Sequence, residues 1–295
     1  MQEYYPGFGR QTMLADYHVH TEFSADSEYP IEEVVRDGIE KGLDEICFTD
    51  HVDYGVQDDW EDGVEIRYRT GGPNDPPLMP LMNVDYPRYY EAIRYLQKKY
   101  SEKIELKFGL EFGVQMSTVQ KYEKLFSEYP FDFIILSIHQ IDDKEFWNQA
   151  FQTGKTQREY NLAYYREMLN VVRSYKNYSV LGHLDMITRY DKAGIFPFEE
   201  TESLVTEILK QIIEDGKGIE INTSYHRYGL PDSTPSRKIL EKYRDLGGKI
   251  VTIGTDSHRK EHLGAYISEA KKELKKIGFD SFCTFEKMQP VYHRL

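Results

Sequence analysis

Short apolar runs alternate with helical segments through almost the whole chain, and this alternation most constrains the fold. The run that ends in "ADYHVH" is followed by "PIEEVVRDGIEKGLDE", whose apolar residues recur at helical spacing, and then by the strand-like "EICFTDH". The five further candidate strands are "IELKFGLE", "FDFIILSIH", "YSVLGHLD", "GIEINTS" and "KIVTIGTDSH". Predicted helices between them lie near residues 87–100, 118–128, 159–175, 201–216 and 236–246. Repeated βα units without a domain linker predict a parallel sheet that closes into one seven-stranded α/β barrel.

One long segment, residues 53–84, interrupts this pattern. It holds several Pro and Gly residues, too few apolar residues for a core element, and more residues than an ordinary βα loop. It is either a surface insertion or a lid over the mouth of the barrel, where loops leaving the carboxyl ends of strands line active sites. The acids Asp58, Asp59, Glu61 and Asp62 would give such a lid an acidic face. We predict a single domain over residues 1–295 with this lid-like insertion.

Composition narrows the class of protein. The 37 Lys and Arg residues against 50 Asp and Glu residues give a net charge of -13, which disfavours nucleic acid as a partner. The N-terminus has no apolar signal region, and no run of about 18 apolar residues suggests a membrane span. The two cysteines, Cys47 and Cys283, are expected to be free thiols in a reducing compartment. We therefore expect a soluble, cytoplasmic protein that acts on a small molecule.

Metal-binding residue types stand where the predicted strands end. They are His18 and His20, His51, Glu111, His139, His183, Asp256 and His258, in chain order. A lone histidine beside an apolar strand is usually a core residue, but histidines at successive strand ends of a parallel barrel converge on one face. Residues two apart on a strand point to the same side, so both imidazoles of "HVH" can reach one cation. Mixed nitrogen and oxygen ligands favour Zn, Mn or Fe over Ca or Mg.

These motifs carry a family resemblance. "YHVHTEFSAD", "FTDH", "GLEFG", "LSIH", "GHLD" and "GTDSH" occur in this order over nearly the whole chain. As a set they resemble the PHP (polymerase and histidinol phosphatase) family, and most closely its stand-alone histidinol-phosphatase branch. The resemblance implies a distorted (β/α)7 TIM-like barrel whose strand ends hold three divalent transition-metal ions, Zn, Mn or Fe.

The resemblance also implies how the ligands divide among the metals. The first metal would be held by His18, His20, Glu111 and Asp256. Glu111 would bridge to a second metal, which His139 and His183 also hold, and a third would take Asp26, His51 and His258. Asp26 stands where some relatives carry a histidine, so the third site differs in ligand type.

The implied reaction is hydrolysis of L-histidinol phosphate to L-histidinol and phosphate, a step of histidine biosynthesis. Elementary chemistry agrees with a phosphoesterase, because clustered cations lower the pKa of a bridging water, generate hydroxide near pH 7 and neutralise the phosphoryl oxygens during attack on phosphorus. No protein nucleophile is needed. We assign catalytic roles to Glu111, Asp256 and His51.

Supporting residues are predicted from their places near strand ends. Arg158, Arg189 and Arg227 are candidates to bind the substrate phosphate, the first two ahead of the third. Asp16, Asp50 and Asp185 either accept the second N–H of a ligand imidazole or serve ordinary capping and turn roles. Outside the motifs, His226, His262 and His293 are interpreted as structural or surface residues, although His226 could reach the pocket.

Three alternatives stay open at this point. The barrel could act on another sugar or nucleoside phosphate, or on a nucleic-acid end, which the acidic charge disfavours. An amidohydrolase would share the His-x-His strand and a final aspartate, but not Glu111 and His258 in these motifs. The chain could also be a catalytically idle metal-binding barrel, which a complete ligand set disfavours.

Overall fold

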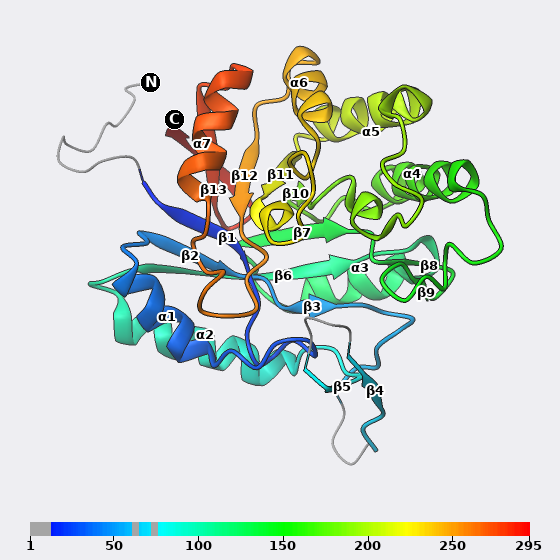
Figure 1. Ribbon diagram of the computed structural model, residues 1–295. Helices are drawn as coiled ribbons and strands as arrows, with labels where there is room; N and C mark the ends of the chain where they lie inside the picture. Colours follow the sequence, from blue (N-terminus) through cyan, green and yellow to red (C-terminus); the bar gives the residue numbers. More distant parts are fainter. Residues whose placement is uncertain (1–12, 61–64, 72–75) are drawn as a thin grey trace.

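A nearly closed parallel barrel forms the centre of the computed structural model, which describes residues 13–60, 65–71 and 76–295 (Figure 1). Its strands follow the order β1-β2-β6-β7-β10-β11-β12 and are parallel throughout. They are β1 (Ala15–Val19), β2 (Glu45–Phe48), β6 (Glu105–Gly113), β7 (Phe133–Ser137), β10 (Val180–Leu181), β11 (Gly218–Asn222) and β12 (Val251–Gly254). The ring closes where the His20 N–H donates to the Ser257 carbonyl, just after β1 and β12, at 2.8 Å. The predicted seven-stranded barrel is confirmed.

Helices cover the outside of the barrel. They are α1 (Ile31–Glu40), α2 (Tyr86–Tyr100), α3 (Val119–Glu128), α4 (Gln157–Ser174), α5 (Glu202–Glu214), α6 (Arg237–Asp245) and α7 (Ile267–Ile277). Figure 1 shows α1 and α2 on one side of the strands and α4 to α6 on the opposite side. Local sequence explains where helices begin: Asp85 accepts from the Arg88 N–H at the start of α2, and Thr156 forms a capping box with Glu159 at the start of α4. All predicted helices are present; α7 was not predicted.

Two small hairpins lie near the carboxyl ends of the barrel strands. Within the 53–84 insertion, β4 (Tyr68–Thr70) pairs antiparallel with β5 (Leu78–Pro80). After β7, β8 (Gln140–Ile141) pairs with β9 (Lys144–Glu145). The short strand β3 (His51–Val52) runs beside β6 and places His51 opposite Glu111. The insertion therefore contains a hairpin of its own.

The chain ends in an antiparallel hairpin that the sequence analysis did not predict. It consists of β13 (Ser281–Glu286) and β14 (Gln289–Arg294). Phe285 packs against Phe133 with ring centroids 5.0 Å apart, and its N–H donates to the Tyr17 hydroxyl at 2.7 Å. The hairpin thus completes the core beside the first residue of β7.

Cys47 and Cys283 are both buried free thiols, as expected. Short 3-10 helices follow several strands; those used below are η2 (Met186–Tyr190), η3 (Phe198–Glu200) and η4 (Thr223–His226). Among the helices that the structure describes, none has both the length and the apolar content needed to cross a bilayer.

Candidate metal centre

Glu111, fully buried on β6, is the centre of the site. Its Oε2 lies 3.1 Å from His18 Nε2, 3.6 Å from His20 Nε2 and 3.0 Å from His51 Nδ1. Its Oε1 lies 3.1 Å from His139 Nε2 and 2.8 Å from His183 Nε2. Residues as distant in sequence as His18 and His183 therefore meet around one carboxylate, because parallel strands end on the same face.

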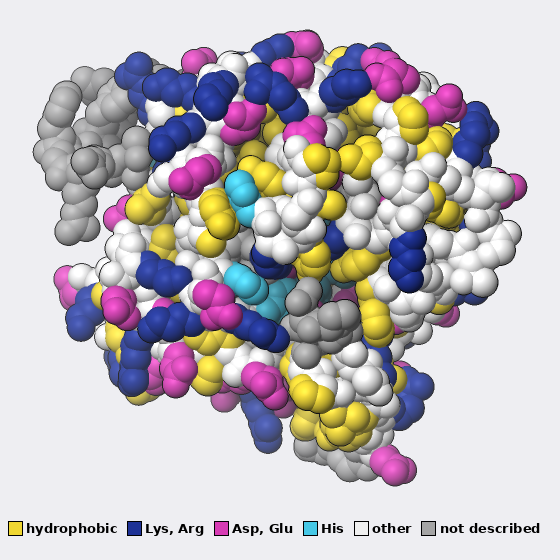
Figure 2. Space-filling model, in the orientation of Figure 1, with side chains coloured by type: hydrophobic (Ala, Val, Ile, Leu, Met, Phe, Trp, Pro, Cys, Tyr) yellow, Lys and Arg dark blue, Asp and Glu magenta, His cyan; other side chains and the backbone are white. Residues whose placement is uncertain are grey.

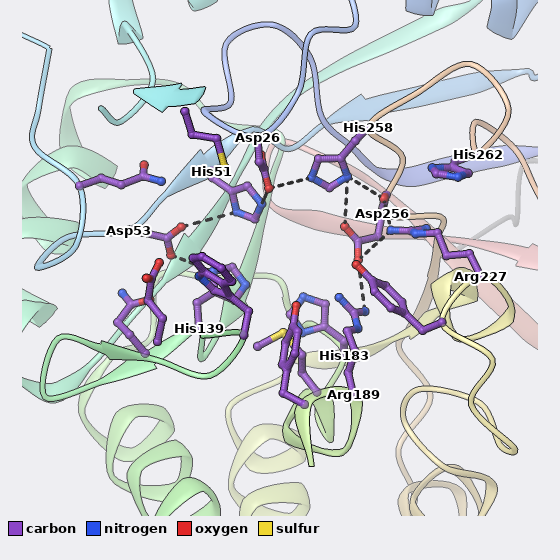
Figure 3. Close-up of a pocket in the computed structure, with 18 of the residues that line it drawn as sticks. Asp26, His51, Asp53, His139, His183, Arg189, Arg227, Asp256, His258 and His262 are labelled. Carbon is purple, nitrogen blue, oxygen red and sulfur yellow. Dashed lines mark hydrogen bonds and ion pairs between the residues drawn. The ribbon is translucent and has the colours of Figure 1, made fainter. Parts of the chain in front are cut away.

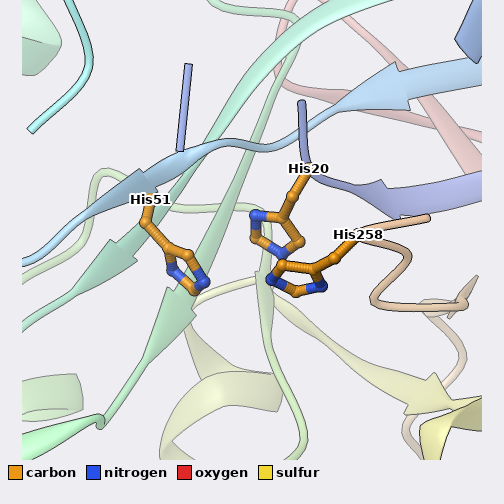
Figure 4. A group of neighbouring side chains, drawn as sticks. All are labelled: His20, His51 and His258. Carbon is orange, nitrogen blue, oxygen red and sulfur yellow. The ribbon is translucent and has the colours of Figure 1, made fainter. Parts of the chain in front are cut away.

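Two aspartates complete the cluster. The Oδ1 of Asp256 lies 3.9 Å from His18 Nε2 and 3.5 Å from His20 Nε2. The Oδ2 of Asp26 lies 3.4 Å from His51 Nε2 and 3.1 Å from His258 Nε2. Figure 4 shows His20 between His51 and His258, and its ring centroid lies 4.2 Å from each of theirs. The structure thus brings all of the predicted ligands together.

Several buried polar atoms in this cluster make no hydrogen bond. They are His18 Nε2, His20 Nε2, His51 Nδ1, Asp26 Oδ1 and Glu111 Oε2. Leaving buried donors and acceptors unpaired costs about 1–3 kcal/mol each unless another partner satisfies them. Three or more ligand atoms converge within 4.8 Å of one another in groups such as His18, His20 and Asp256, or His20, His51 and His258. Imidazole nitrogens and carboxylate oxygens pointing at shared points fit bound divalent transition metals.

The second nitrogen of several imidazoles is held by a neighbour, which fixes the ring and its tautomer. His18 Nδ1 lies 2.6 Å from Glu220 Oε1, and His139 Nδ1 lies 2.8 Å from Asp53 Oδ1. His20 Nδ1 lies 3.2 Å from Ser24 Oγ, which donates to Asp50 at 2.8 Å. Sequence spacing alone does not predict these partners. Glu220 could have been singled out from the sequence, because it is a lone charged residue inside the apolar strand "GIEIN".

The alternative in which Asp16, Asp50 and Asp185 accept directly from ligand imidazoles is wrong. Asp16 accepts from the Thr255 hydroxyl and from the Thr255 and Gly264 N–H groups. Asp50 accepts from the Thr21 N–H and from Ser24, and Asp185 accepts from the Ser236 N–H. The three carboxylates therefore accept from backbone and hydroxyl donors and hold the neighbouring loops together. Asp50 supports His20 only through Ser24.

Neighbouring charges determine the protonation of the cluster. Burial opposes the charged form of His139, but Asp53 and Glu111 outweigh it and raise the pKa of His139 to about 9. Burial also opposes the charge of Glu111, yet His18, His139 and His51 hold the pKa of Glu111 well below its usual range. Burial and the neighbouring His258 and His51 lower the pKa of His20. The lowered pKa favours the neutral imidazole of His20, which is the form that binds metals.

The three candidate arginines have different surroundings. Arg189, on η2, has a side chain that is 5% exposed and donates to Ser224 Oγ at 2.7 Å and to Asp256 Oδ2 at 3.3 Å. Arg227 also approaches Asp256 Oδ2, at 3.4 Å. The prediction that Arg158 lies at the site is wrong: its side chain is 65% exposed and pairs with Glu200 at 3.2 Å. Arg158 lies in the first turn of α4, which directs it towards η3 on the surface.

A cavity of about 230 Å³ opens above the cluster (Figure 3). Figure 2 shows histidine side chains in a hollow of the molecular surface. The cavity is lined by candidate metal ligands together with Arg189 and Arg227. It is also lined by Gln57, Arg69 and Met79 from the insertion and by Gln140, Glu145 and Trp147 from the region of the β8–β9 hairpin.

The insertion contributes to this cavity differently from the prediction. Asp58 pairs with Arg67, and Asp59 accepts from Asn83 and Tyr86, so neither lines the cavity. Glu61 and Asp62 lie outside the described residues. His262 was interpreted as a surface or structural residue, yet it lines the cavity, whereas His226 stacks between Tyr225 and Tyr266.

Comparison with known proteins agrees with this fold. The PHP domain matches residues 16–224, and the chain belongs to the PHP domain family. The histidinol-phosphatase of Lactococcus lactis subsp. lactis (strain IL1403) is 33% identical over 279 residues, covering 93% of this chain and 95% of that protein. A probable histidinol-phosphatase of Thermotoga maritima is 30% identical over 268 residues, covering 90% and 94%.

Solved structures show the same architecture. The histidinol phosphate phosphatase of Lactococcus lactis, complexed with zinc, L-histidinol and phosphate, superposes with a TM-score of 0.78 at 32% identity and covers 94% of this chain and 98% of its own. The putative histidinol phosphatase of Listeria monocytogenes gives a TM-score of 0.70 at 18% identity, covering 86% and 99%, and shows the shared fold.

Proposed function

We propose that this chain hydrolyses L-histidinol phosphate to L-histidinol and phosphate with bound divalent metal ions. The observation that carries the proposal is the buried Glu111 carboxylate, surrounded by imidazoles whose free nitrogens have no other partner. The similar Lactococcus lactis enzyme, whose structure holds zinc, L-histidinol and phosphate, supports this substrate. The reaction fits a place in histidine biosynthesis.

We further propose that the cluster holds three ions, of Zn, Mn or Fe. The first would be bound by His18, His20, Glu111 and Asp256, the second by Glu111, His139 and His183, and the third by Asp26, His51 and His258. When bound, such ions supply an activated water at neutral pH and neutralise charge on the phosphoryl oxygens. Glu220, Asp53 and Ser24 would orient the imidazoles.

Arg189 is the protein cation best placed to bind the phosphate. Its side chain lines the cavity, and its Nη2 is fixed by Ser224 and Asp256. The guanidinium also lies 4.2 Å from the Tyr228 ring centroid, which limits its motion. A fixed guanidinium on the cavity wall offers a charge-assisted hydrogen bond to a phosphate oxygen without further ordering.

The alcohol part of the substrate would occupy the side of the cavity away from the metals. Of the carboxylates that line the cavity, Asp26, Asp53 and Asp256 contact the histidines, so Glu145 remains for the substrate's ammonium group. Glu145 already pairs with Arg69 and accepts from Asn148, but each carboxylate oxygen can accept a further N–H. Trp147, 5.2 Å from the Arg69 guanidinium, adds an aromatic face for the imidazole ring.

This assignment predicts selectivity for an amine-bearing substrate. We expect kcat/KM for L-histidinol phosphate to exceed that for glycerol phosphate by roughly tenfold or more, equivalent to ~1.4 kcal/mol from one charged contact. The measurement is phosphate release from both esters with added Zn, Mn or Fe. Glu145→Gln should reduce the ratio while p-nitrophenyl phosphate hydrolysis changes little. Equal efficiency on all three esters would identify a general phosphoesterase instead.

A further inference from the structure

Asp256 has an unusual backbone for a proposed metal ligand. It follows β12 and has a φ of 55°, in the left-handed region that residues with a side chain rarely adopt. Such a conformation costs on the order of 1–3 kcal/mol and persists only where surrounding contacts impose it. In this structure it directs the carboxylate towards His18 and His20, at 3.9 and 3.5 Å.

Arg227 supplies contacts that can impose this conformation. Its Nη1 donates to the Thr255 carbonyl at 2.7 Å, and its Nη2 donates to the Asp256 carbonyl at 2.6 Å. The same Nη2 lies 3.4 Å from Asp256 Oδ2. One guanidinium therefore holds two successive carbonyls and the side chain of the strained residue. A lysine, with a single charged nitrogen, cannot reproduce this planar fork.

The position of Arg227 is itself fixed by the chain. It caps the 3-10 helix η4, where its N–H donates to the Ser224 carbonyl at 2.9 Å. Its guanidinium lies 5.2 Å from the Tyr228 ring centroid. His258 adds a second contact to the same peptide, since its Nδ1 lies 2.9 Å from the Asp256 carbonyl oxygen. The turn after β12 is thus held from two sides.

Arg227 differs from Arg189 in the groups that it contacts. Both terminal nitrogens of Arg227 donate to backbone carbonyls of the Thr255–Asp256 turn, whereas Arg189 donates to the Ser224 hydroxyl and the Asp256 carboxylate. We propose that Arg227 is a positioning residue, which holds Asp256 in the left-handed conformation that directs its carboxylate into the metal centre. Arg189, and not Arg227, would bind the substrate phosphate. This inference rests on the proposed metal centre, but not on the identity of the substrate.

Metal affinity tests this role without requiring activity. Chelator-stripped protein is titrated with Zn against a competing fluorescent chelator, for wild type, Arg227→Met, Arg227→Lys, Asp256→Ala and the double variant Arg227→Met/Asp256→Ala. We expect Arg227→Met to weaken the affected site about tenfold or more, as loss of a ligand-orienting partner does, without rescue by lysine. The double variant should bind no more weakly than Asp256→Ala, because Arg227 acts through Asp256.

Kinetics at saturating metal separates the two possible roles. If Arg227 positions Asp256, the Arg227→Met variant loses kcat. Its KM for L-histidinol phosphate stays within about threefold of wild type, because Arg189 and not Arg227 would bind the phosphate. Unchanged zinc affinity, or a double variant that binds zinc more weakly than Asp256→Ala, overturns the proposal. Should Arg227→Met fail to fold, Arg227→Gln retains one amide donor and takes its place. If the wild-type protein binds zinc but does not hydrolyse L-histidinol phosphate, the proposed function is contradicted and the role of Arg227 is not.

Discussion

Replacing Glu111 by alanine should reduce phosphate release from L-histidinol phosphate by roughly a thousandfold or more. The carboxylate contacts the imidazoles of five histidines at once. Removing a single transition-state contact already costs about 10²–10³ in kcat, and this change would also separate two proposed metal sites. The measurement is kcat at saturating substrate and metal.

Metal binding and stability provide the control for Glu111→Ala. Ligands that bind only the native state stabilise it by about 2.7 kcal/mol at a hundred times Kd, so wild type should unfold at a higher temperature with Zn than with chelator. Glu111→Ala should lose most of this difference, while Glu105→Ala, at the exposed start of β6, should keep it. Near-normal turnover of Glu111→Ala with full metal content would contradict the bridging role.

Replacing Arg189 by methionine should raise KM for phosphomonoesters by about tenfold to a hundredfold. The substitution removes the buried guanidinium, so the bound phosphate loses a charge-assisted hydrogen bond worth about 1.5–3 kcal/mol. Bound metal should stay unchanged. Arg158→Met is the matched control, because Arg158 pairs with Glu200 on the surface and should leave KM unaffected. If Arg189→Met has the KM of wild type, the metals and other groups hold the phosphate.

The barrel and the ligand cluster could be predicted because both follow from strand order. Apolar runs ending in His18, His51 or His183 are local signals, and a parallel barrel brings their ends to one face whatever the intervening loops do. The supporting residues could not be predicted in the same way. Glu220 and Asp53 support the ligands from strands or loops whose partners are set by three-dimensional packing.

Loop geometry explains the predictions that failed. Arg158 was assigned to the site because it follows β7 in sequence, but the residues between β9 and α4 lead it onto the surface. Asp16 is two positions from His18, yet its carboxylate accepts from the N–H groups of Thr255 and Gly264, which follow β12. Spacing along the chain specifies a strand face, whereas it does not specify which neighbouring loop reaches that face first.

Metal-dependent turnover tests the central claim most directly. Chelator-stripped protein is titrated with Zn, Mn or Fe while bound metal per chain and phosphate release from L-histidinol phosphate are measured together. We predict no hydrolysis without metal, and recovery of full activity as the cluster around Glu111 fills with up to three ions per chain. Full activity in metal-free protein, or a filled cluster that hydrolyses no phosphomonoester, would contradict the account.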